Sequence, residues 1–180
     1  MGPNKYANFD YWLRESVVRA LRLKLDRPPS LRVLDLGSGT GYFLLVCRTL
    51  GHDARGIDLE EVAVFNDMVA LLGVSRQTHL VSPESPLPPG EERYDLITAF
   101  MVTFNGVEPD REWKREEWAV FLDNCLRRLT PGGRLFLSFN YSQRRGCFYD
   151  AETADLFDSL PGCRTRREGN EVLITLAGRR

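Results

Sequence analysis

A short apolar segment, a run of alternating glycines and the start of a helix follow one another along the chain, and this junction constrains the fold most. Residues 32–36 read as a buried strand, and Gly37, Gly39 and Gly41 then alternate with small polar residues. Glycine lets the backbone turn sharply and lets a ligand approach without meeting a Cβ atom. The helix predicted at residues 42–50 begins with free N–H groups and a partial positive charge, to which a phosphate or a carboxylate can bind.

Strand-like and helical segments alternate along most of the chain. Apolar side chains at helical spacing predict a first helix over residues 9–24. Alternation of strands and helices indicates a parallel sheet that is covered on both faces. Further strands are expected at 54–59, 79–81, 94–100 and 134–139, and further helices at 60–72, 112–129 and 151–160.

The C-terminal segment differs from this alternation. Residues 163–167 and 171–176 are both strand-like, and Gly169-Asn170 between them is typical of a tight antiparallel hairpin. No repeat or linker divides the chain, and its 180 residues suit one domain. We therefore expect a single domain over residues 1–180, with the helical segment 1–30 packing on it or capping it.

Composition excludes several classes of protein and site. The formal net charge of −1 gives no global attraction to nucleic acid or to an anionic membrane. No apolar run approaches the roughly 20 residues of a membrane helix, and the polar N-terminus lacks a signal-peptide pattern. The four cysteines form no C-x-x-C pair, so we expect reduced thiols in a cytoplasmic protein and no metal site.

Two cofactors compete for the glycine loop. The dinucleotide fingerprint G-x-G-x-x-G fails in both registers, because its third glycine would fall on Tyr42 or on Leu44. The observed spacing is D-x-G-x-G-x-G, which begins at Asp35. Asp58 ends the second predicted strand, where a carboxylate can accept from both hydroxyls of a ribose. Dinucleotide folds also use an acid there, so the glycine spacing distinguishes the two cofactors and Asp58 does not.

The D-x-G-x-G-x-G run resembles the first motif of class I S-adenosylmethionine-dependent methyltransferases. Residues 94–100 resemble the fourth strand of that family, and the L-x-P-G-G sequence at 129–133 resembles its turn into the fifth strand. The resemblance runs from about Leu31 to Phe139, and more loosely to the C-terminus. It implies an α/β fold: a Rossmann-like, doubly wound, seven-stranded and mostly parallel sheet with an antiparallel C-terminal hairpin.

The resemblance also implies roles for individual residues, with S-adenosyl-L-methionine as the cofactor. Asp35 would organise the loop and the cofactor's amino group, Asp58 would hold the ribose, and Leu59 would lie near the adenine. The family often has an Asp at the end of the third strand, but here the region reads Leu80-Val81-Ser82-Pro83-Glu84. Ser82 is our choice for the adenine contact, with Glu84 behind it. The predicted cofactor-binding residues are Asp35, Gly37, Ser38, Gly39, Gly41, Asp58, Leu59, Ser82 and Phe100.

Transfer of a methyl group from a sulfonium needs a nucleophile in line with the S–CH3 bond, and a general base is optional. We therefore assign no catalytic residue, and neither His52 nor His79 lies at the expected ligand edge. Segments 103–112 and 140–149 should reach the carboxyl edge of the sheet, where Asn105, Asn140 and Tyr141 are candidate substrate contacts, and Trp113 could wall a pocket.

These loops are short and of mixed charge, which favours a small-molecule acceptor, although the oligomeric state stays open. The arginines at 164, 166 and 167 are expected on a solvated hairpin face, and nucleic acid is not favoured. The alternatives are methylation of RNA or protein, or a module that binds S-adenosylmethionine without turnover.

Overall fold

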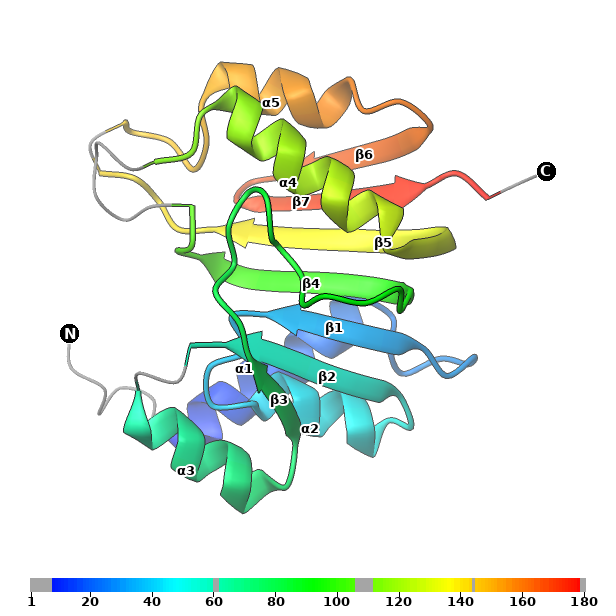
Figure 1. The fold of residues 1–180 in the computed structure, drawn as a ribbon. Coiled ribbons are helices and arrows are strands. Elements are labelled where there is room, and N and C mark those ends of the chain that lie inside the picture. Colours follow the sequence, from blue (N-terminus) through cyan, green and yellow to red (C-terminus); the bar gives the residue numbers. More distant parts are fainter. Residues whose placement is uncertain (1–7, 60–61, 106–111, 144, 179–180) are drawn as a thin grey trace. The chain divides into compact units, whose positions relative to one another are not determined.

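The computed structural model describes residues 8–59, 62–105, 112–143 and 145–178. The chain divides into two compact units, Met1–Thr78 and His79–Arg180. Among the described residues the strands form a seven-stranded sheet that is mostly parallel and carries an antiparallel C-terminal hairpin, which confirms the predicted fold class (Figure 1). None of the described helices is long and apolar enough to span a bilayer.

The first unit alternates helices and strands, and its three strands are parallel, in the order β3-β2-β1. Helix α1 packs on α2, and α2 packs on β2. The ring of Phe9 meets Tyr42 edge-on, with ring centroids 5.4 Å apart. The elements are α1 (Phe9–Arg22), β1 (Arg32–Leu36), α2 (Tyr42–Thr49), β2 (Asp53–Asp58), α3 (Ala63–Leu72) and β3 (Ser75–Thr78).

The ends of these helices follow from local sequence. The Asn8 side chain accepts a hydrogen bond from Tyr11 N at 3.2 Å and caps α1. At the other end of α1, Lys24 lies in the left-handed region, and Leu25 N donates to Ala20 O at 2.9 Å, which is a Schellman ending. Gly73 stops α3 with φ 60°, as its sequence position predicted.

The third strand is not where the sequence placed it. The prediction put it at residues 79–81, whereas β3 is Ser75–Thr78 and residues 79–81 are irregular. β3 pairs with β2 alone at the edge of the sheet, and its side chains are mostly exposed. An edge strand needs no apolar pattern, so the apolar pair Leu80-Val81 was a misleading signal.

The second unit contains the remaining strands, in the order β4-β5-β7-β6. β4 and β5 are parallel, and β7 is antiparallel to both β5 and β6. The hairpin predicted around Gly169-Asn170 is confirmed, with φ 57° at Gly169. The elements are β4 (Tyr94–Val102), α4 (Arg115–Arg127), β5 (Leu129–Phe139), α5 (Ala151–Asp158), β6 (Cys163–Glu168) and β7 (Glu171–Leu176).

Aromatic side chains fill the interior of the second unit. Trp118 of α4 packs edge-on against Phe121, Phe139 and Phe157 with centroids 5.5 to 6.0 Å apart, and all four are buried. Such rings contribute much of the burial energy of a small core. Trp113 joins this cluster and is 8% exposed, so it packs in the core of the unit rather than presenting its ring to solvent.

Candidate functional site

The glycine loop is pinned to the end of the neighbouring strand by its own backbone. Gly37 N and Ser38 N both donate to Ile57 O, at 2.9 and 3.0 Å, and Gly41 N donates to Ser38 O at 3.0 Å. Gly37, Gly39 and Gly41 have φ of 71°, 54° and 83°, a region that side-chain-bearing residues rarely adopt. The loop therefore needs glycine at all three predicted positions.

Asp58 completes this arrangement from the end of β2. Its Oδ2 accepts from Gly39 N at 2.6 Å, and its Oδ1 accepts from Leu59 N at 2.7 Å. A carboxylate has about four lone-pair directions, so both oxygens keep the capacity to accept from a ligand. Gly39 of the loop after β1 and Asp58 at the end of β2, both singled out from the sequence, are thus hydrogen-bonded to each other.

The surroundings of the glycines differ in a way that matters for ligand access. A Cβ added at Gly37 or at Gly39 would meet no atom within 4 Å, so the loop is open on that side. A Cβ at Gly41 would lie 2.7 Å from Val74 Cγ2, so that glycine is also needed for packing. Gly56 of β2 is also needed for packing, because a Cβ added there would lie 2.4 Å from Ser38 Oγ. The structural requirement at Gly56 was not identified from the sequence.

Ser38 turns its hydroxyl toward the sheet. Its Oγ is buried and has no hydrogen-bond partner among the described residues. Since that atom would collide with a Cβ on Gly56, it faces β2. Ser38 would therefore contact a ligand through its backbone.

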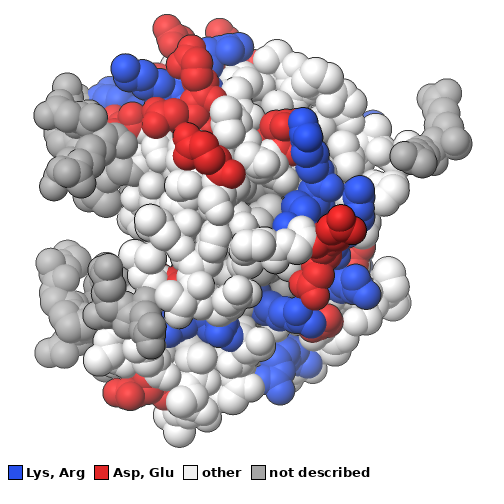
Figure 2. Space-filling view, in the orientation of Figure 1, with Lys and Arg blue, Asp and Glu red and all other residues white. Residues whose placement is uncertain are grey.

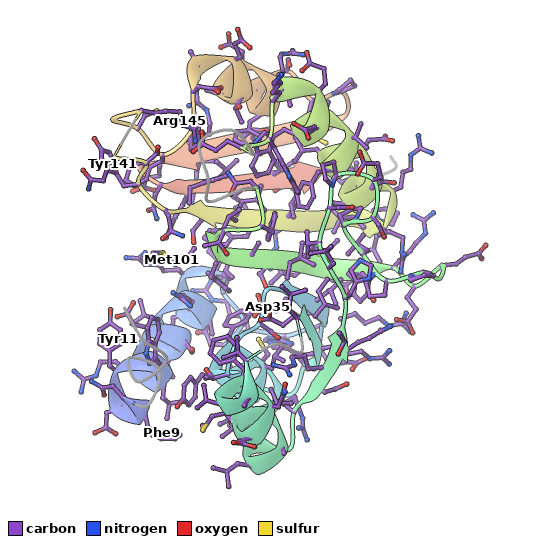
Figure 3. The ribbon with its side chains drawn as sticks, turned by 60° about the vertical axis from the view of Figure 1, so that its left-hand side comes forward. Phe9, Tyr11, Asp35, Met101, Tyr141 and Arg145 are labelled. Carbon is purple, nitrogen blue, oxygen red and sulfur yellow. The ribbon has the colours of Figure 1, made fainter. Side chains whose placement is uncertain are left out.

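Asp35 lies on β1 directly before the loop and is 3% exposed (Figure 3). It pairs in register with Gly56. Burial raises the pKa of the Cys47 thiol, and the nearby charge of Asp35 raises it further. Asp35 is thus a buried acidic residue close to Cys47 of α2, and its role in organising the loop stays a prediction.

One basic residue that contacts this loop was not predicted from the sequence. Arg76 of β3 donates through Nη1 to Gly39 O at 3.2 Å, and its other terminal nitrogen donates to the side-chain oxygen of Asn66 on α3. No sequence signal identified Arg76, because the third strand was expected elsewhere.

The remaining predicted cofactor residues lie in the second unit. Ser82 is four residues beyond the end of β3 rather than at that end, and its Oγ accepts from Ser85 N at 3.1 Å in a local turn. Phe100 of β4 is half-buried, and its ring packs against Phe136 with centroids 5.4 Å apart. Their contact with a cofactor stays a prediction.

Asn140 holds the end of β4. Its Nδ2 donates to Met101 O at 2.9 Å and to Val102 O at 3.2 Å, while Ser138 Oγ accepts from Met101 N at 2.9 Å. Met101 has φ 54°, which costs energy for a residue with a side chain. The amide nitrogen of Asn140 therefore serves the backbone, and only its side-chain oxygen remains for a substrate.

Asn105 and Tyr141 lie at the two loops that the sequence assigned to the acceptor. Asn105 O accepts from Trp113 N at 2.8 Å, which joins the ends of a segment whose residues 106–111 are outside the described residues. Tyr141 is 50% exposed and packs edge-on against Phe148 (Figure 3). In the same loop, Arg145 forms ion pairs with Glu112 at 3.2 Å and Asp150 at 3.5 Å.

The histidines have structural partners. His52 is buried, with Nδ1 accepting from Leu31 N at 3.0 Å and Nε2 donating to Leu25 O at 2.7 Å. The ring thus bridges two chain segments. His79 Nε2 lies 2.8 Å from Ser85 O. In the part of the chain that the structure describes, no three potential ligands cluster as a metal site would require.

Solved structures with the same fold include methyltransferases. DesVI from Streptomyces venezuelae superposes with a TM-score of 0.66 at 13% identity, covering 93% of this chain and 92% of that chain. CalS10, an amino pentose methyltransferase from Micromonospora echinaspora solved with bound SAM, gives a TM-score of 0.63 at 16% identity and covers 91% of each chain. At these identities the likeness shows the fold.

Sequence comparison shows the family. The malonyl-(acyl-carrier protein) O-methyltransferase of Methylococcus capsulatus is 32% identical over 117 residues, which are 62% of this chain and 38% of that protein. The chain thus matches well under half of that relative's length. The family described as "Methyltransferase domain" matches residues 9–170. The chain belongs to this family, the class I S-adenosylmethionine-dependent methyltransferases.

Proposed function

We propose that the chain transfers a methyl group from S-adenosylmethionine to a small-molecule acceptor by in-line displacement. The observation that carries the proposal is the bond of 2.6 Å from Gly39 N to Asp58 Oδ2, which places a carboxylate beside an open glycine loop. We further propose that both compact units belong to one methyltransferase domain, since the family match spans residues 9–170.

The residues present fit this cofactor. Asp58 keeps lone pairs for the two ribose hydroxyls, the open sides of Gly37 and Gly39 allow a nucleoside to lie against the loop, and Leu59 follows as an exposed apolar residue for the adenine. Asp35 supplies a buried negative charge for the cofactor's amino group. When bound, the cofactor supplies a methyl group already activated on a sulfonium.

The chain's own contribution to the chemistry is orientation. Holding two reactants in line can supply about 7–11 kcal/mol of a barrier. Asp58 and the glycine loop fix the donor side. Asn105, Asn140 and Tyr141 are our candidates for the acceptor side, with the side-chain oxygen of Asn140 as the polar contact. An amine, thiolate or phenolate acceptor needs no dedicated base.

A small acceptor is favoured over RNA by the distribution of charge. Among the described residues on the face shown in Figure 2, Lys and Arg side chains are interspersed with Asp and Glu. In the arginine-rich hairpin, Arg167 is paired with Asp158 at 2.6 Å. Proteins that bind nucleic acid through phosphates instead present a basic stripe.

The test is calorimetry followed by an acceptor screen. Binding of S-adenosylmethionine and S-adenosylhomocysteine, with no binding of NAD(H), is the expected result, and the opposite pattern would overturn the cofactor assignment. Labelled methyl transfer is then measured with pooled small metabolites, with RNA and with protein. Label in RNA or protein alone would replace the small-molecule acceptor, and cofactor binding without any transfer would indicate a binding module.

A further inference from the structure

Two charged side chains hold consecutive peptide groups of the glycine loop. The peptide before Gly39 donates its N–H to Asp58, at 2.6 Å. The peptide after Gly39 offers its C=O to Arg76, at 3.2 Å from Nη1. Because the peptide planes on both sides of the Gly39 Cα atom are held, both backbone dihedrals of Gly39 are fixed.

The position of Arg76 suits it to this contact. Arg76 pairs in register with Gly56, so the two residues face the same side of the sheet. Gly56 has no side chain, and Ser38 of the loop lies close against it. The guanidinium also binds the side-chain oxygen of Asn66 on α3. A planar guanidinium with a fixed fork of donors is oriented when two of its nitrogens are bound.

The conformation of Gly39 needs such support. Glycine populates positive and negative φ about equally, so the peptide after Gly39 can rotate at little intrinsic cost. A change in the Gly39 dihedrals turns the two peptide planes relative to each other, so the loop would have to shift or the bond from Gly39 N to Asp58 would be disturbed. A loop that must be ordered on binding loses affinity relative to one that is ordered beforehand.

We propose that Arg76, oriented by Asn66, is a positioning residue of the cofactor site. It holds the Gly39 peptide in the conformation that keeps Asp58 aimed at the ribose. The inference rests on the proposed function, because it takes the glycine loop as the cofactor loop. Arg76 acts through the loop and touches none of the reacting atoms.

The test measures S-adenosylhomocysteine affinity by calorimetry and amide hydrogen exchange at Gly39 in the ligand-free protein. Arg76→Ala should weaken binding about tenfold, the order expected for one charge-assisted hydrogen bond, and should speed exchange at Gly39. Arg76→Lys should recover part of the affinity, because it keeps the charge and a donor but loses the fork. Asn66→Ala should weaken binding by about threefold, and should add nothing in the Arg76→Ala background.

Two controls separate positioning from general damage. Gln77→Ala changes the next residue of β3, which is exposed, and Arg55→Ala removes an exposed positive charge from β2. Both should bind S-adenosylhomocysteine as the wild type does. If the Arg76→Ala protein does not fold, the inference is tested by the S-adenosylhomocysteine affinity and the Gly39 exchange rate of Asn66→Ala and Arg76→Lys.

The outcomes distinguish this inference from the proposed function. Wild-type affinity in the folded Arg76 and Asn66 variants, with unchanged exchange at Gly39, would overturn the inference and leave the cofactor assignment intact. A wild-type protein that binds no S-adenosylhomocysteine would overturn the cofactor assignment. Even in that case, faster amide exchange at Gly39 in Arg76→Ala would show that Arg76 holds the glycine loop in place.

Discussion

The Oδ2 atom of Asp58 lies 2.6 Å from the backbone nitrogen of Gly39, so the residue that ends β2 holds the loop that follows β1. Its other oxygen accepts from Leu59 N at 2.7 Å. Each carboxylate oxygen therefore faces a backbone N–H. The side chain orders the loop and remains able to accept from a ligand on its other lone pairs.

Replacing the Asp58 carboxylate by an amide should weaken cofactor binding, although the side chain keeps its shape. In Asp58→Asn one side-chain atom becomes an NH2 group that faces a backbone N–H, so one of the two hydrogen bonds is lost. We expect S-adenosylhomocysteine affinity to fall at least tenfold by calorimetry, since hydrogen bonds to charged groups contribute about 1.5–3 kcal/mol. Asp58→Ala should lose more.

Asp53→Asn is the matched control, because Asp53 begins the same strand and its side chain is 59% exposed. It should leave the affinity unchanged. Equal affinities of the Asp58→Asn protein and the wild type would remove the ribose assignment.

The contact between the glycine loop and Asp58 was predictable because its residues are encoded in short runs. The spacing of Asp35 and the three glycines fixes a strand, a turn and a helix start within ten residues, and Asp58 follows one helix later. Local conformation and the parallel arrangement of β1 and β2 then bring Gly39 and Asp58 together. No tertiary contact beyond this βαβ unit had to be known.

The parts that were missed depend on contacts between distant residues. β3 is polar because it lies at the sheet edge, and its misplacement hid Arg76, which is 37 residues from the Gly39 carbonyl. Asn140 is a predicted substrate contact, and the sequence did not show that its amide nitrogen also binds backbone 38 and 39 residues away. A sequence pattern gives the chemical type of such a side chain, but it does not give its partner.

Gly56→Ala should destabilise the protein through packing against the loop. Its Cβ would lie 2.4 Å from Ser38 Oγ and 2.7 Å from Leu44 Cδ1. Overpacking of this kind costs about 1–3 kcal/mol of unfolding free energy, measured by urea denaturation. The cost should shrink in a Ser38→Gly background, where the closest atoms are gone. An undiminished cost there would show that Ser38 is not the source of the clash.

Lys24→Gly should stabilise the protein. Lys24 has φ 59° in the Schellman ending of α1, a position that glycine adopts without strain. Relief of the strain should raise the unfolding free energy by about 1 kcal/mol. Lys24→Ala removes the same side-chain charge but keeps the strain, so it should give no gain. A glycine variant no more stable than the alanine variant would contradict this explanation.

Two buried thiols should make stability fall at alkaline pH. Burial raises the pKa of both Cys47 and Cys125, and the charge of Asp35 adds to the effect at Cys47. The unfolded chain loses these thiol protons above about pH 8.5 while the folded chain keeps them. The unfolded state then binds fewer protons, so the unfolding free energy decreases as pH rises.

The effect is isolated by comparing the wild type with a Cys47→Ala/Cys125→Ala variant under reducing conditions. Between pH 7.5 and 9.5 the wild type should lose about 1.4 kcal/mol per thiol more than the variant, from urea denaturation at each pH. Burial raises the pKa of Cys163 as well, but this residue is present in both proteins and cancels in the difference. Parallel pH profiles would mean that the two thiols ionise alike in the folded and unfolded chains.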